Sequence, residues 1–244
     1  LRDETLKSER ASLVHLFEAE VIEGEGYAEV TLPSSAEMAE FDHMEFDLST
    51  TCQGGGEYGS CPAWDRIVSL FLCDETNPDS CDLEIGRWIT TYHREGRWVH
   101  DVTPLLPLIK NGGVRRFRFV SQDPWEITLS IRLASLGKAV RPVETIPLFQ
   151  GNNTFDETYN SLFTPLSLSI PQGLRAVRLA TLITGHGMSS PGNCAEFCNT
   201  THHFYINDSE YVRDFPEVSN SYGCMLQVSS GTVPNQYGTW WYWR

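Results

Sequence analysis

The sequence has no apolar run long enough to cross a bilayer, so no membrane-spanning helix is expected and the protein is predicted to be soluble. Positive charge is scarce. The 18 Lys and Arg residues face 32 Asp and Glu residues, and the resulting net charge of −14 offers no basic stripe to nucleic acid. Helical periodicity is almost absent, apart from a possible turn or two in ERASLVHLFEAE (9–20).

The first residues, LRDETLKSERAS, are charged, and they contain neither an initial Met nor the apolar segment of a signal peptide. A processed or trimmed N-terminus is therefore expected. The 244 residues are 41% hydrophobic and 11% aromatic, which is enough to build a packed core in one large domain or two ordinary ones.

Alternation with a period of two residues recurs along the chain and predicts strands with one buried face. The run IVSLFL (67–72) is apolar on both faces and predicts a central strand. Clusters of Gly, Pro, Asn and Asp separate these segments, as expected of a β-sandwich or barrel. The inward-facing residues of the alternating segments are Ala28, Val30, Leu32; Met44, Phe46, Leu48; Ile127, Leu129, Ile131, Leu133; and Leu166, Leu168, Ile170.

A domain boundary is predicted near residues 138–145, where LGKAVRPVET interrupts the strands with charge and proline. The predicted domains are residues 1–138 and 139–244. The second is short for a sandwich of the same kind.

Six of the seven cysteines fall into close pairs: Cys52–Cys61, Cys73–Cys81 and Cys194–Cys198. Short disulfide loops of this kind indicate an oxidising compartment, so the protein is expected to be secreted, either extracellular or periplasmic. A zinc site is the alternative, but the sequence has no CxxC, and His202 and His203 are adjacent rather than spaced as ligands. If THHFYIN is a strand, these two histidines point to opposite faces, one packed and one exposed.

The segment Cys61-Pro62-Ala63-Trp64-Asp65-Arg66 leads directly into the doubly apolar run. Apolar surroundings raise the pKa of a carboxyl group, and a nearby arginine lowers it. A carboxylate in such a place is a candidate for acid–base chemistry. A purely structural role, accepting backbone N–H bonds at the strand end, is the alternative.

A second candidate segment combines Gly185-His186-Gly187 with the sequence Asn193-Cys194-Ala195-Glu196-Phe197-Cys198. A disulfide across this loop would fix the Glu196 carboxylate. The alternative is a stapled hairpin tip with a solvated glutamate. The final Trp240-Trp241-Tyr242-Trp243 run is either a sugar-stacking surface or part of an unfinished core.

Taken in order, these blocks resemble the bacterial peptide-N-glycosidase F family. CPAWDRIVSLFL resembles its WDR strand, EIGRWITTY its EIGRFITPY block, and NCAEFC its GCAEWC loop. HDVTPLLPLI and ITGHG also resemble family segments, and VETIPLF resembles the strand that opens the second domain. The similarity spans residues 15–244. Because Cys224 matches a family cysteine whose partner lies beyond Arg244, the resemblance predicts a C-terminally truncated homologue.

The resemblance implies an all-β fold of two antiparallel jelly rolls packed side by side, the second incomplete, with the active site between them. It implies hydrolysis of the amide that joins asparagine to the first N-acetylglucosamine, without a metal or organic cofactor. The substrate would be an N-linked glycoprotein or glycopeptide, and the protein is expected to be a monomer.

By the same resemblance, Asp65 matches the principal catalytic carboxylate and Glu196 a second one from the other domain. The substrate-binding residues implied are Trp64, Arg66, Gln122, Asp123, Trp125, His186, Phe197 and Arg244.

Two positions depart from the family pattern. Where the family has a third carboxylate, strict matching puts Gln122, and a shift of one residue would put Asp123. Phe197 stands where the family usually has Trp. A glutamine can position a water but cannot take its proton, so a non-catalytic glycan-binding or adhesion module is the main alternative function. A copper monooxygenase on paired jelly rolls is a remote one, because it needs spaced His and Met ligands.

Overall fold

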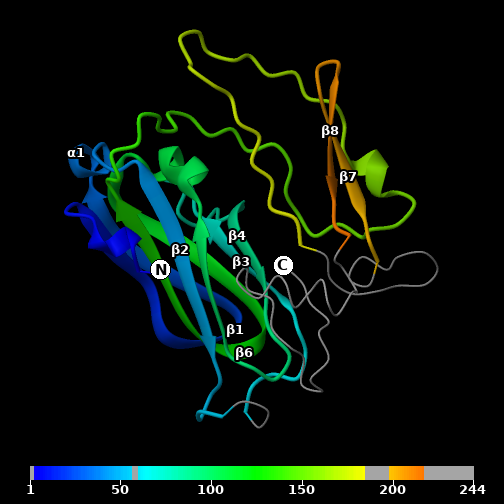
Figure 1. Ribbon diagram of the computed structural model, residues 1–244. Helices are drawn as coiled ribbons and strands as arrows, with labels where there is room; N and C mark the ends of the chain where they lie inside the picture. The colour runs from blue at the N-terminus through cyan, green and yellow to red at the C-terminus, as the bar shows by residue number, and fades with distance from the viewer. Residues whose placement is uncertain (1–2, 57–59, 185–197, 217–244) are drawn as a thin grey trace.

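The computed structural model describes residues 3–56, 60–184 and 198–216 (Figure 1). Six strands form one antiparallel sheet, and a separate two-stranded hairpin follows near the end of the described residues. The all-β class predicted from the sequence is thus confirmed. The sheet comprises β1 (Ala11–Ser34), β2 (His43–Thr51), β3 (Ile67–Leu72), β4 (Leu83–Ile89), β5 (Gly96–Asp101) and β6 (Gly112–Ala134); the hairpin comprises β7 (Thr201–Ile206) and β8 (Ser209–Asp214).

Short helical turns complete the secondary structure of the described residues. They are η1 (Thr5–Lys7), α1 (Ser35–Met38), η2 (Thr103–Ile109) and η3 (Tyr159–Leu162). The single turn of α1 follows β1 directly. It begins with a capping box, in which the Ser34 hydroxyl accepts from the Glu37 N–H while the Glu37 carboxylate accepts from the Ser34 N–H.

The two long strands β1 and β6 pair along their whole length, and β6 changes its other partner halfway. Its first half pairs with β3, from Phe117 to Ser121, and its second half pairs with β2, from Glu126 to Ala134. The register with β1 shifts between these halves, at residues 122–124. Such a bulge bends a strand and tolerates a proline, which explains Pro124 at this position.

Because β6 bends, the two ends of the sheet fold over and face each other. The Trp88 ring of β4 lies 6.2 Å from the Phe46 ring of β2. It also stacks on His100 of β5, with ring centroids 6.1 Å apart, and burial there lowers the pKa of His100. These contacts join the β3–β4 and β2–β5 arms into a sandwich-like unit (Figure 1).

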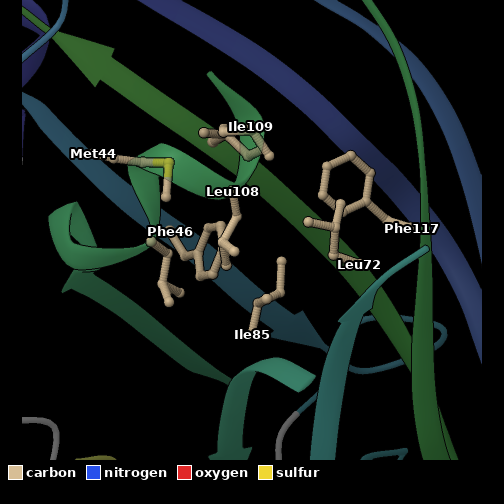
Figure 2. A pocket seen from close by; sticks show the side chains of 9 residues that line it. Met44, Phe46, Leu72, Ile85, Leu108, Ile109 and Phe117 are labelled. Carbon is tan, nitrogen blue, oxygen red and sulfur yellow. The ribbon is translucent and has the colours of Figure 1, made fainter. Parts of the chain in front are cut away.

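The interior of this unit is apolar and closely filled. Figure 2 shows its small central cavity, where Met44 and Phe46 approach Ile85, Leu72 and Phe117 beneath the η2 turn. All the residues lining it are hydrophobic. A site for a polar substrate therefore has to lie at the edge of this unit and not inside it.

Most strand predictions are confirmed. GYAEVTLP lies in β1, HMEFDLS in β2, and ITLSIRLA in β6, and each turns its predicted inward residues toward the core, with Val30 only partly buried at its edge. IVSLFL is β3, which lies between β4 and β6 as expected of a central strand.

Three predictions are wrong. The possible helical turn in 9–20 is part of β1, because pairing with β6 outweighs a weak local pattern. LSLSI forms no strand, nor does VETIPLF, which the resemblance implied would open the second domain. Among the described residues neither segment has a neighbouring strand to accept its backbone hydrogen bonds, which a strand requires.

The chain after β6 is tied to the six-stranded unit at successive points. Lys138 donates from its backbone N–H to Asp42 and from its ammonium group to His43 Nδ1 at 2.7 Å. Further along, the Thr145 hydroxyl donates to the Pro104 carbonyl. Gln150 reaches the free edge of β4, where its Oε1 accepts from the Glu84 N–H at 3.0 Å. The predicted boundary at 138/139 falls within this run and stays a prediction.

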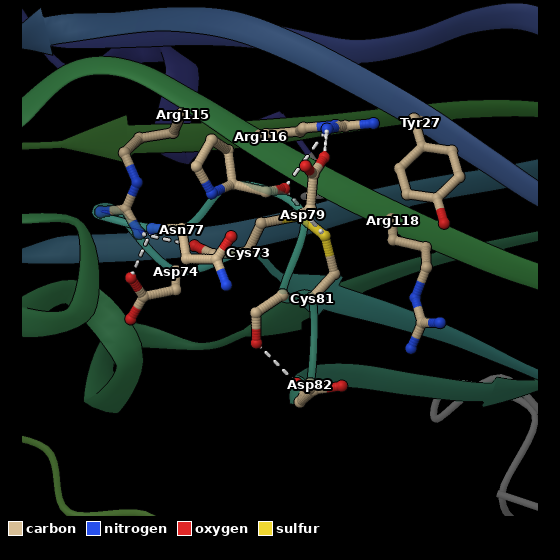
Figure 3. The surroundings of a disulfide bond; sticks show 12 residues. Tyr27, Cys73, Asp74, Asn77, Asp79, Cys81, Asp82, Arg115, Arg116 and Arg118 are labelled. Atoms are coloured by element: carbon tan, nitrogen blue, oxygen red, sulfur yellow. Dashed lines mark hydrogen bonds and ion pairs between the residues drawn. A yellow bond between two sulfur atoms is a disulfide. The ribbon is translucent and has the colours of Figure 1, made fainter.

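The disulfides Cys52–Cys61 and Cys73–Cys81 are both formed, as the spacing predicted. Figure 3 shows the second, whose loop lies against β6: Arg116 pairs with Asp79 at 2.8 Å and Arg115 donates to the Cys73 carbonyl. The first closes the segment just before Pro62. It therefore anchors one end of the WDR segment.

Candidate functional site

The segment Trp64-Asp65-Arg66 connects the Cys52–Cys61 loop to β3. Asp65 is 4% exposed, whereas its neighbour Trp64 is 60% exposed. The Trp64 ring meets Tyr92 edge-on, with ring centroids 6.4 Å apart. The segment thus turns a carboxylate inward and presents an aromatic surface beside it.

Arg66 links this segment to the bulge of β6. Its Nε lies 3.7 Å from Asp123 Oδ2, and both side chains are partly buried. Asp123 is in the bulge at residues 122–124, whereas Gln122 in the same bulge is exposed. Gln122 and Asp123 are the two residues that could stand at the family's third-carboxylate position. Of the two, Asp123 lies against the WDR segment.

Trp125 is completely buried. It belongs to the hydrophobic core, opposite Ile22 of β1 in the sheet register. Its ring presents no surface to a substrate here, and this burial favours a packing role over the substrate contact implied by the resemblance. The physical reason is the bulge: it returns β6 to regular alternation at Trp125, with this side chain on the inner face.

The loop after β4 supports the WDR segment. Its first three residues end the EIGRWITTY block, but sequence reasoning gave no residue of this loop a role at the site. Thr90 exchanges two hydrogen bonds with Arg66, and the His93 N–H donates to the Pro62 carbonyl at 3.0 Å. His93 has φ of 51°, an uncommon left-handed conformation for a residue other than glycine. No pattern in the sequence marks such a backbone conformation, and only the buried contact reveals it.

In the β7–β8 hairpin the two histidines point to opposite faces, as predicted. His202 is half-buried among aromatic rings, 6.0 Å from Phe155 and 5.9 Å from Phe215, and burial together with the charge of His203 lowers its pKa. His203 is exposed, and its Nδ1 lies 2.7 Å from Glu210.

Several predicted site residues lie outside the described residues: His186, Cys194, Glu196, Phe197 and Arg244. Their roles stay predictions. Cys198 is described and is disulfide-bonded, with its partner outside the described residues. The predicted Cys194–Cys198 pair and the unpaired Cys224 therefore remain untested.

Within residues 3–56, 60–184 and 198–216, no three His, Cys, Asp or Glu side chains gather in a way that could hold a metal ion. In the same part of the chain, no helix has the length and apolar character needed to span a membrane.

Comparison with known proteins places the chain. Residues 158–244 match the family described as "Peptide-N-glycosidase F, C terminal". No curated protein matches. The solved structure titled "Recombinant peptide: N-glycanase F (PNGase F)" is similar with a TM-score of 0.54 and 16% identity, over 84% of this chain and 71% of that one. PNGF-II, in its P21 crystal form, is similar with a TM-score of 0.53 and 13% identity, over 95% of this chain and 55% of that one. At such identity these structures show the fold alone, and the match of residues 158–244 to the family model agrees with the resemblance found in the sequence: this chain resembles the peptide-N-glycosidase F family.

Proposed function

We propose that the protein is an amidohydrolase that cleaves the bond between asparagine and N-acetylglucosamine in N-linked glycoproteins or glycopeptides, releasing the intact glycan and leaving aspartate. The observation that carries the proposal is the buried Asp65 carboxylate, next to an arginine that lies 3.7 Å from a second carboxylate, Asp123. The family match supports the same reaction class.

The chemistry suits these groups. Hydrolysis of an amide needs an activated water and a proton for the departing nitrogen. A carboxylate in a water-poor place can take a proton from the water and then give it to the nitrogen. Asp65 is the group we assign to this role. Arg66 would stabilise the oxyanion that develops on the amide carbonyl. Asp123 is the third carboxylate in this proposal, because Gln122 cannot take up a proton. Glu196 is assigned the role of second carboxylate on the resemblance alone.

The exposed ring of Trp64 beside Tyr92 suits the flat face of a sugar, and we assign it to glycan contact. His186, Phe197 and Arg244 are proposed as further substrate-binding residues from the resemblance. The two disulfides and the family support an extracellular protein.

The same aromatic surface also fits the alternative, a glycan-binding module without catalysis. The two functions differ in one product. An amidase releases intact glycan from a denatured N-glycoprotein and converts the linked asparagine to aspartate, whereas a binding module retains the glycopeptide unchanged.

The test is the Asp65→Asn variant, with the released glycan measured by chromatography and the asparagine-to-aspartate conversion by mass spectrometry. Loss of the acid–base group should slow release on the order of 10²-fold or more. Asp79→Asn is the matched control, because Asp79 is an exposed aspartate whose carboxylate pairs with Arg116 at the surface. Near-normal release by Asp65→Asn would refute the assignment. Glycopeptide binding without any release by the unaltered protein would favour the binding module.

A further inference from the structure

We propose that Thr90 and His93 are positioning residues that hold the Asp65 segment in its reactive geometry, an inference that rests on the proposed function. Neither residue belongs to a motif that sequence analysis marked as chemical. Both lie in the loop that follows β4, and together they form hydrogen bonds with the chain on either side of Asp65.

Thr90 holds the residue after Asp65 through an unusual extension of the β3–β4 ladder. The last regular pair is Ile67 with Ile89, so Arg66 and Thr90 stand opposite each other one step further. The Thr90 N–H donates to the Arg66 carbonyl at 2.9 Å, as in an ordinary ladder. The Arg66 N–H donates instead to the Thr90 hydroxyl oxygen, also at 2.9 Å.

The Thr90 hydroxyl oxygen thus takes the place of a backbone carbonyl as the acceptor for the Arg66 N–H. The ladder can end at Thr90 without leaving the Arg66 N–H unsatisfied, and the backbone of the loop is free to turn back toward Pro62. Thr90 is 2% exposed, so no bulk water replaces its hydroxyl if that group is removed. The bond therefore depends on a hydroxyl at this position.

His93 holds the segment at its other end. Its N–H donates to the Pro62 carbonyl at 3.0 Å, three residues before Asp65. The backbone adopts φ of 51° to make this bond, a left-handed conformation that is strained for a residue other than glycine. Its Nδ1 is buried and meets no hydrogen-bond partner among the described residues. Strain of this kind is retained where the surrounding structure requires one particular backbone path.

Asp65 thus lies in a five-residue stretch that the Cys52–Cys61 disulfide precedes and two hydrogen-bonded anchors enclose. A carboxylate that activates water must be held to within a fraction of an ångström. A shift of about 1 Å can cost on the order of 10²-fold in rate. The anchors act on the backbone beside Asp65, and we assign them no contact with the reacting atoms.

The experiment compares Thr90→Val with Thr90→Ser. Valine has nearly the same shape as threonine and removes the acceptor, whereas serine keeps it. Thr50→Val is the matched control, because Thr50 is also fully buried and its hydroxyl has no hydrogen-bond partner among the described residues. The measurements are kcat and KM for glycan release from a glycopeptide, and hydrogen exchange of the Arg66 amide.

We expect Thr90→Val to lower kcat about tenfold or more with KM changed less than about twofold, since positioning affects the transition state more than binding. The Arg66 amide should exchange faster in this variant. Thr90→Ser should restore both quantities, and Thr50→Val should alter neither. Normal kcat in Thr90→Val, with the Arg66 amide exchanging faster, would overturn the positioning role. Thr90→Val and the unaltered protein both failing to release glycan would instead refute the proposed function.

His93→Gly gives an independent measurement. Glycine removes the left-handed strain and leaves the N–H in place, so the midpoint of thermal unfolding should not fall. The loop should nevertheless become more mobile, and kcat should drop several-fold. A lower kcat at equal or higher thermal stability supports the inference, because a merely structural role would lower both together. Unchanged kcat would overturn the role of His93.

Discussion

Similar alternating sequence patterns form a buried strand in the chain up to Ala134 and no strand in the described chain after it. In β6, Ile127, Leu129 and Ile131 alternate with polar residues and are almost completely buried. In the segment 166–170, Leu166 and Leu168 alternate with serine in the same manner, yet both are about half exposed and form no strand. The pattern is the same and the outcome differs.

The difference lies in the neighbours. β6 has β1 on one side, and on the other it pairs with β3 from Phe117 to Ser121 and with β2 from Glu126 to Ala134, so its apolar face closes over a core. For 166–170, the described residues supply no adjoining strand. Alternation thus predicts which side chains would face inward if a sheet forms, and it does not supply the sheet.

The test of this comparison with the largest expected effect uses two leucine-to-alanine substitutions, one in each region. Leu129→Ala should destabilise the protein by about 3 kcal/mol, because it leaves a cavity in a filled core. Leu168→Ala should change the unfolding free energy by less than about 0.5 kcal/mol, as for an exposed side chain. Urea unfolding followed by tryptophan fluorescence measures both. Equal destabilisation by the two variants would mean that 166–170 is buried in solution and that the two regions do not differ as described.

How far sequence reasoning reaches follows from the same physics. The alternation located three strand segments, and cysteine spacing identified two disulfides, because both are local signals. The choice between Gln122 and Asp123 was open in the sequence, since a one-residue register shift is invisible there. The β6 bulge shows that Asp123 is the one beside Arg66.

The support of Asp65 by Thr90 and His93 was not predictable in the same way. These residues are more than twenty positions away along the chain. Apart from the Thr90 hydroxyl, they bond to the Asp65 segment through backbone N–H groups, which nearly every residue type has. The burial of Trp125 was missed for a related reason. The resemblance alone placed Trp125 among the substrate-binding residues, and the burial of its ring depends on the bulge that precedes it in β6.

A second prediction sharpens the comparison through the polar face of the six-stranded unit. Arg132 of β6 is 2% exposed, and its guanidinium meets Asp47 of β2 and Asp3. Burial by itself raises the pKa of Asp47, but hydrogen bonds from Arg97 and the charge of Arg132 more than offset this and hold it below the usual 3.8. The carboxylate form therefore stabilises the fold.

Asp47→Asn should lower the unfolding free energy at neutral pH by about 2 kcal/mol, because a buried guanidinium loses a charged partner. For the unaltered protein, this contribution is present above the ordinary value of 3.8 and is lost as the pH falls below it, through the lower folded pKa. The stability of Asp47→Asn should consequently depend less on pH in that range. Chemical unfolding at a series of acidic pH values tests this, and parallel curves for the two proteins would contradict it. Asp79→Asn, at an exposed pair, is again the control.

The smallest expected effect concerns the tie between the two regions. The Gln150 side-chain amide forms hydrogen bonds with the backbone at the edge of β4, as a neighbouring strand would. It donates to the Asp82 carbonyl at 2.6 Å and accepts from the Glu84 N–H at 3.0 Å. Arg87 reinforces it by pairing with both carboxylate oxygens of Glu84 and donating to the Gly151 carbonyl at 2.9 Å. These contacts give the EIGR block a structural role, which is to attach the later chain to the sheet.

Gln150→Met keeps the length of the side chain and removes both of its hydrogen bonds. The loss should cost only about 1 kcal/mol in global stability, since the bonds are exposed, and the core is untouched. Locally the effect should be larger: the Glu84 amide should exchange faster, and proteases should cut residues 152–184 more readily while the fragment ending near Ala134 persists. Gln172→Met, at an exposed glutamine of the same region, should change neither readout. If Gln150→Met left proteolysis and exchange unchanged, contacts other than those at the β4 edge would hold the later chain. The later chain would then not depend on this edge for its attachment to the sheet.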